Sequence, residues 1–228
     1  MALPLPRAEK LETRLQELGD PERAAGEKRY LKSELEFLGV TVPVIRREAR
    51  ALGRLTRPDA VEIAAALWER PVFDLRFAAV EVLVHAVAEL LPEDLAVVER
   101  FLREAKTWAL VDGLAAEVAG PIVERHPDEG GAVLDRWAAD PDFWLRRASL
   151  LALLIPLRQG GGDFERFSRY AESMLGEKEF FIRKAIGWVL RDTSRKRPEL
   201  VRAWVEARRE RMSGLTLREA TRRLPPAQ

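Results

Sequence analysis

An acid and an aromatic residue in the middle of the chain are spaced for a common site. Trp108 and Asp112 are four positions apart, and on a helix this spacing places an indole one turn from a carboxylate. A carboxylate beside an apolar wall acts more strongly on a nearby positive charge, because less water screens it. The alternative is structural, with Trp108 packed in the core and Asp112 an ordinary surface acid. The spacing alone leaves both interpretations open.

A second group of residues has the composition of a nucleic-acid contact. Lys184, Trp188 and Arg191 follow at intervals of four and three, so a helix would present them on one face. Cations neutralise phosphates, and an indole packs on a sugar or a base. The alternative is a cation–π arrangement between helices of the same protein. These three residues are called the basic–aromatic stripe below.

The charge of the chain is unevenly distributed along its length. Residues 141–228 contain 19 basic and 11 acidic residues, a net charge of +8, whereas residues 1–140 contain 19 and 26, a net charge of −7. The C-terminal portion is therefore a candidate surface for a polyanion. A solvated surface rich in arginine would give the same count.

Other residue types limit the chemistry and the location of the protein. The chain has no cysteine and two histidines, His85 and His126, that are far apart in sequence, so we expect no protein-held metal and no thiol chemistry. Pro4 and Pro6 interrupt the N-terminal segment, and no window approaches the ~20 apolar residues of a membrane span. We expect a protein without membrane contact, located in the cytoplasm.

The elements that must position these residues are helices. Apolar residues recur at intervals of three and four, and Gly and Pro separate the segments, which predicts an all-α protein of about ten or more helices. A six-residue motif recurs at 73–78 (FDLRFA), 108–113 (WALVDG), 143–148 (FWLRRA) and 180–185 (FFIRKA). The starts are 35, 35 and 37 residues apart, a period typical of helical-hairpin repeats that stack into a solenoid.

The positions of the motif differ in what they predict. The third is always Leu or Ile and the sixth always Ala or Gly, which indicates core contacts and close helix packing. The fifth varies with the copy: Phe77, Asp112, Arg147 and Lys184. Equivalent points on successive repeats would then present an aromatic residue, an acid and two bases along one surface, and we expect that surface to be the concave side.

Residues 178–191, KEFFIRKAIGWVLR, resemble the signature segment of the AlkD-like DNA alkylation repair glycosylases. Four further segments resemble the same family in the same order: 30–39 (YLKSELEFLG), 106–112 (KTWALVD), 143–148 (FWLRRA) and 217–220 (LREA). The resemblance covers nearly the whole chain, so we expect residues 1–228 to form a single domain. It implies a HEAT-like helical-repeat solenoid, an α-α superhelix with a concave DNA-binding face.

The resemblance also implies an activity and roles for particular residues. The activity is hydrolysis of the N-glycosidic bond of N3- or N7-alkylated purines, such as 3-methyladenine and 7-methylguanine, in duplex DNA, without a cofactor. Asp112 would be the catalytic acid, Trp108 and Trp188 would pack around the deoxyribose of the lesion, Arg147 would contact the DNA backbone, and Tyr30 would form a further wall. The helical spacing adds Lys184 and Arg191 as DNA-binding residues. We expect a monomer that is nucleoid-associated when bound to DNA.

One departure from the family pattern concerns substrate scope. Members of the family often carry paired tryptophans and a further acid before the Val-Asp pair, whereas Ala109 and Leu110 stand here. A roomier or less polar site is the expected consequence. Two other functions stay open: a catalytically inert HEAT-like scaffold that binds DNA structure or a protein partner, and a glycosylase specialised for bulky adducts, with self-protection as one role.

Overall fold

A computed structural model describes residues 4–224, which form helices joined by short connections, with one isolated pair of β-bridged residues, Glu36 and Val72. The all-α prediction is confirmed. The chain divides into two compact units, Met1–Leu114 (unit 1) and Ala115–Gln228 (unit 2), and each is described by itself. No helix in the described range is long and apolar enough to cross a membrane.

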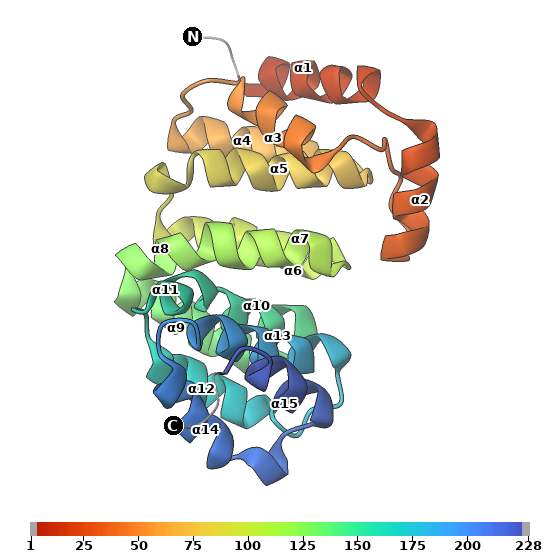
Figure 1. Cartoon of the computed structure of the whole chain (residues 1–228). Coiled ribbons are helices and arrows are strands. Elements are labelled where there is room, and N and C mark those ends of the chain that lie inside the picture. Colours follow the sequence, from red (N-terminus) through yellow and green to blue (C-terminus); the bar gives the residue numbers. More distant parts are fainter. Residues whose placement is uncertain (1–3, 225–228) are drawn as a thin grey trace. The chain divides into compact units, whose positions relative to one another are not determined.

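Unit 1 is built mainly from paired helices (Figure 1). Helices α1, α3, α4 and α5 pack on one another, and α7 packs on both α5 and α6. The core includes Leu15 of α1, Ile45 of α3 and Trp68 of α4, and Trp68 stacks on Phe101 of α6 with ring centroids 4.2 Å apart. The elements are α1 (Pro4–Glu17), α2 (Pro21–Leu31), α3 (Val42–Arg50), α4 (Arg57–Trp68), α5 (Phe73–His85), η1 (Val87–Glu89), η2 (Pro92–Asp94), α6 (Leu95–Ala105) and α7 (Trp108–Gly113).

Unit 2 continues the pattern of paired helices. Helix α13 is central, because it packs against α10, α11, α14 and α15. A π-helical segment, η3 (Leu114–Ala119), precedes its first α-helix. The remaining elements are α8 (Gly120–Arg125), α9 (Pro127–Ala138), α10 (Phe143–Leu151), α11 (Leu154–Gln159), α12 (Phe164–Met174), α13 (Phe180–Thr193), α14 (Pro198–Glu206), η4 (Arg209–Arg211) and α15 (Gly214–Thr221).

Side-chain caps define where many of these helices begin. Asp20, Thr56, Asp142, Asp163 and Ser213 each precede a helix and accept a hydrogen bond from a backbone N–H of its first turn. These N–H groups have no partner within the helix, so a capping oxygen stabilises the first turn by roughly 1 kcal/mol. The local sequence therefore fixes helix boundaries before any packing is considered.

The repeat motif corresponds to one structural unit in every copy. Each of the four predicted copies starts at the first residue of a helix: α5, α7, α10 and α13. The third positions are all at most 1% exposed: Leu75, Leu110, Leu145 and Ile182. The alanines at the sixth position are fully buried as well: Ala78, Ala148 and Ala185. The prediction that these two positions make packing contacts is confirmed.

The arginine at the fourth position of the motif braces the connection that precedes its helix. Arg76 donates to the carbonyl oxygens of Trp68 and Glu104, at 3.1 and 2.9 Å. Arg146 donates to the carbonyl oxygen of Asp140 at 2.6 Å, and Arg183 to that of Glu177 at 2.8 Å. Carbonyl groups at helix ends lack intrahelical partners, so these guanidinium groups satisfy them. This position therefore has a structural role.

The structure reveals a fifth copy of the motif, which begins one residue into α15. Residues 215–220 read LTLREA and start 35 residues after the copy at 180. Ala220, at the sixth position, is fully buried, whereas Leu217, at the third, is only half-buried. The fifth position of this copy is Glu219, so unit 2 carries Arg147, Lys184 and Glu219 at equivalent points.

Helix α2 buries none of its residues and depends on the segment that follows it. Asp74, fully buried at the start of α5, accepts hydrogen bonds from the backbone N–H groups of Leu38 and Val40, both at 2.7 Å. Gly39 lies between them with φ of +80°, and a Cβ there would lie 2.2 Å from the carbonyl oxygen of Asp20. Only glycine fits this position, so the turn holds α2 at the edge of unit 1 (Figure 1).

Candidate functional site

Helix α7 presents Trp108 and Asp112 on its accessible side. Both residues are partly exposed, whereas Leu110 and Val111 between them are fully buried. Helix α7 lies close to α5 at Gly113, where a Cβ would lie 3.1 Å from Cγ1 of Val80. Trp108 is thus not a buried core anchor, although it occupies the same motif position as the buried Phe73. The geometry favours the interpretation in which the indole and the carboxylate share an accessible helical face.

Tyr30 of α2 meets Trp108 although 78 positions separate them in sequence. Their ring centroids are 6.4 Å apart and the ring planes are nearly perpendicular, at 84°. This edge-to-face arrangement is a favoured geometry for aromatic pairs. Tyr30 is 75% exposed, so it adds an aromatic surface that solvent and ligands can reach. Unit 1 therefore brings together three residues that the sequence predicts for one site: Tyr30, Trp108 and Asp112.

The basic–aromatic stripe lies on α13 as predicted, and it is held by carboxylates from two elements. Lys184 Nζ is 3.1 Å from Oε1 of Glu219, and Arg191 Nη1 pairs with Oε2 of the same residue. Trp188 Nε1 donates to Oδ2 of Asp192 at 3.2 Å. Asp192 is buried, and its Oδ2 also accepts a hydrogen bond from Nε of Arg158 on α11 at 2.8 Å. The indole and both cations are therefore pre-positioned.

Two of these anchors are absent from the sequence-based prediction. Asp192 could have been found, because it follows Trp188 by four residues on the same helix. Glu219 lies within the segment 217–220, and the 35-residue period places it opposite Lys184. The period was the available signal, since the helical spacing of α13 says nothing about α15.

Arg147 has a different environment from the other predicted DNA contacts. The residue is 4% exposed, and its Nη1 donates to the carbonyl oxygen of Phe181 at 2.5 Å. Its guanidinium also lies 5.8 Å from the centroid of the Phe181 ring. In this geometry Arg147 joins α10 to α13, and contact with a DNA phosphate stays a prediction.

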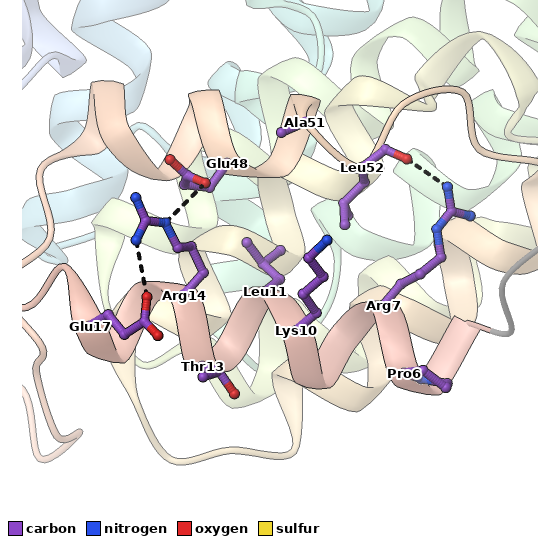
Figure 2. A pocket seen from close by; sticks show the side chains of 10 residues that line it. All are labelled: Pro6, Arg7, Lys10, Leu11, Thr13, Arg14, Glu17, Glu48, Ala51 and Leu52. Carbon is purple, nitrogen blue, oxygen red and sulfur yellow. Dashed lines mark hydrogen bonds and ion pairs between the residues drawn. The ribbon is translucent and has the colours of Figure 1, made fainter.

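A cavity of about 850 Å³ lies between α1 and α3 in unit 1 (Figure 2). Arg14 pairs there with Glu17 at 3.0 Å and with Glu48 at 3.7 Å, and Arg7 donates to the carbonyl oxygen of Leu52 at 2.6 Å. None of the residues predicted for the site lines this cavity. Three of its charged residues, Arg14, Glu17 and Glu48, are therefore paired with one another.

Comparison with known proteins gives one family match and several structural matches. A family model described as DNA alkylation repair enzyme matches residues 11–224. A structure described as a predicted DNA alkylation repair enzyme from Enterococcus faecalis has a TM-score of 0.82 and 22% identity, over 92% of this chain and 98% of that one. The structure of AlkD2 from Streptococcus mutans has a TM-score of 0.61 and 16% identity, over 82% and 91%. None of the curated proteins matches the chain significantly.

The two structural matches establish the helical-repeat fold, and the family match extends over nearly the whole chain. The chain belongs to the DNA alkylation repair enzyme family.

Proposed function

We propose that this protein is a DNA glycosylase that hydrolyses the N-glycosidic bond of N3- or N7-alkylated purines in duplex DNA, as a step of base excision repair. The observation that carries the proposal is the edge-to-face pair of Tyr30 and Trp108 on the side of unit 1 where α7 carries Asp112. Family membership supplies the class of damage, and this group of side chains supplies a site suited to its removal.

The proposed chemistry requires a fixed negative charge more than a proton donor. Alkylation at N3 or N7 makes the purine cationic, so it departs with the bonding electrons and leaves an oxocarbenium-like sugar. Asp112 stabilises the positive charge that develops at C1′ and orients the attacking water, as carboxylates do at glycosidic centres. The ring of Trp108, one helical turn before Asp112, limits the access of bulk water to this carboxylate, which strengthens its effect.

Unit 2 contributes DNA binding to the proposal. It carries 21 basic and 17 acidic residues, a net charge of +4, whereas unit 1 carries 17 and 20, a net charge of −3. In the basic–aromatic stripe, Lys184 and Arg191 contact phosphates and Trp188 packs on a deoxyribose of the bound duplex. Phosphate contacts fix the position of DNA without reading its sequence, which suits an enzyme that acts on damage anywhere in a genome.

The departure from the family pattern at 109–110 is confined to one accessible position. Leu110 is fully buried, so its side chain belongs to the core and not to the substrate surface. Ala109 is partly exposed beside Trp108. A small residue there leaves room next to the indole, and we propose that the enzyme accepts adducts bulkier than a methyl group.

The test is release of 7-methylguanine and 3-methyladenine from methylated duplex DNA by the wild type and by Asp112→Asn. We expect the variant to bind duplex DNA as the wild type does and to lose on the order of 10²-fold or more in excision rate. The matched control is Glu62→Gln, which makes the same acid-to-amide change at an exposed position of α4. This control should excise at the wild-type rate.

Equal excision by the wild type and by Asp112→Asn would refute the assigned role of the carboxylate. Binding of DNA without release of either methylated base, and without release of a bulky N7 adduct in the same assay, would refute the glycosylase and favour an inert DNA-binding scaffold. Release of the bulky adduct alone would identify a specialised glycosylase.

A further inference from the structure

Glu219 occupies an unusual place for an acid in a surface proposed to bind DNA. Its two carboxylate oxygens are divided between Lys184 and Arg191, which lie on either side of Trp188 along α13. The Glu219 side chain is 14% exposed, so its charge is only partly screened by water. Both cations of the basic–aromatic stripe therefore share the carboxylate of Glu219, and Arg191 Nε also lies 3.6 Å from Oδ1 of Asp192.

The position of this carboxylate is built into the packing of α15 on α13. Gly187, one residue before Trp188, lies against α15, and a Cβ at Gly187 would come within 2.5 Å of the Cβ of Glu219. The absence of a side chain at Gly187 allows the two helices to lie side by side in unit 2 (Figure 1). The backbone of α15 thus places Glu219 beside Gly187, at the centre of the stripe, where its side chain contacts both cations.

The charge balance of this group has a direct consequence for a polyanion. A phosphate that approaches Lys184 or Arg191 meets a fixed carboxylate already bound to the same cation. Lys184 is the more accessible of the two, with a side chain 42% exposed against 19% for Arg191. DNA binding must therefore loosen one of the two ion pairs with Glu219 or tolerate the carboxylate as a like-charged neighbour.

We infer that Glu219 competes with DNA phosphates for Lys184 and Arg191, and so sets the strength and the salt dependence of duplex binding by unit 2. This inference rests on the DNA binding in the proposed function, but not on the glycosylase chemistry. Glu219 acts through the cations and is not a catalytic residue. Its value to a repair enzyme is weaker binding to undamaged DNA, which lets the protein leave non-substrate sites.

The experiment is the affinity for an unmethylated duplex at several salt concentrations, for the wild type and for Glu219→Gln. The amide keeps the size of the side chain and removes its charge, which adds the equivalent of one available cation. We expect the slope of log K against log salt to steepen by about 0.9, and binding at 0.1 M salt to tighten about eightfold. An unchanged slope, or weaker binding, would overturn the inference.

Two further variants separate charge from geometry. Glu219→Asp keeps the charge but shortens the side chain, so it should pair with the two cations less completely than Glu219 does. Its salt slope should lie between those of the wild type and of Glu219→Gln, and a slope shallower than that of the wild type would overturn the inference. Glu206→Gln, at an acid of α14 paired with Arg209, is the control for a general change in the charge of unit 2 and should leave binding unchanged.

Failure of the inference can be told apart from failure of the proposed function. A wild type that binds DNA but excises nothing loses the glycosylase assignment, while the comparison of slopes still decides the role of Glu219. A wild type that excises methylated bases, with the same slope as Glu219→Gln, keeps its function and loses the inference. A wild type that binds no duplex at low salt refutes both.

Discussion

Replacing Asp74 with alanine should destabilise unit 1 by about 2–4 kcal/mol, because two backbone donors lose their acceptor at once. Asp74 is fully buried and accepts from the N–H groups of Leu38 and Val40, both at 2.7 Å. An unsatisfied buried donor costs about 1–3 kcal/mol. The N–H of Val40 is buried and loses its bond to Asp74, whereas Leu38 is half-buried and its N–H can bind water instead. The expected loss of stability therefore lies below the roughly 6 kcal/mol that two fully buried unsatisfied donors would cost.

The assay is urea denaturation followed by circular dichroism, with the free energy of unfolding and its dependence on urea fitted together. Asp74→Asn keeps one acceptor oxygen, so it should lose about half as much stability as Asp74→Ala. Glu62→Ala, at an exposed position of α4, should change stability little. A loss below about 0.5 kcal/mol for Asp74→Ala, with an unchanged urea dependence, would refute the argument.

This prediction has a functional part as well. The segment that Asp74 fixes connects α2 to the rest of unit 1, and α2 carries Tyr30. Loss of the anchor should therefore weaken the contact between Tyr30 and Trp108 and lower the excision rate, even at temperatures at which the variant stays folded. Tyr30→Phe keeps the ring and should excise nearly as the wild type does.

Further predictions concern unit 2. Lys184→Gln should make the salt slope of DNA binding shallower by about 0.9, and an unchanged slope would remove Lys184 from the phosphate contacts. Gly187→Ala should destabilise the packing of α13 on α15 and lower the melting temperature, because its Cβ would overlap Glu219. Hydrogen bonds from Arg211 and Arg208 lower the pKa of Glu172 below its ordinary 4.5. This carboxylate therefore adds stability above pH 4.5, and the addition is lost as the pH falls through its folded pKa. Glu172→Gln should then be less stable than the wild type at pH 7, with the difference vanishing in acid; a pH-independent difference would contradict this.

The sequence contains most of the information about helices and repeats, because both depend on local periodicity. The four copies predicted from the sequence each begin a helix, and their third positions are buried, since an apolar residue at fixed spacing is satisfied in a core. The sequence pattern does not predict the fifth copy, because Leu215 stands where the other four copies begin with an aromatic residue. The third position of this copy, Leu217, is half-buried, whereas the third positions of the other four copies are fully buried.

Residue spacing alone predicted those parts of the candidate site whose residues share a helix. Trp108 with Asp112, and Lys184 with Trp188 and Arg191, follow from helical spacing and are found on common faces. The contact of Tyr30 with Trp108 came from family resemblance and not from spacing. The burial of Arg147 could not be read from the sequence, because arginine is usually exposed, and its carbonyl partner is a backbone atom that no residue pattern reveals.

The assignment of fixed tasks to single motif positions has a consequence for how such a chain can evolve. The third and sixth positions mainly make packing contacts, and in three copies an arginine at the fourth position donates hydrogen bonds to backbone carbonyl groups. The fifth position has no such shared structural role. It has become Phe77, Asp112, Arg147, Lys184 and Glu219 in successive copies. Because each repeat contacts mainly its neighbours, a substitution at one fifth position is felt by few others. A repeat scaffold of this kind can therefore change the residue at the fifth position of one copy while the packing positions of the other copies stay as they are.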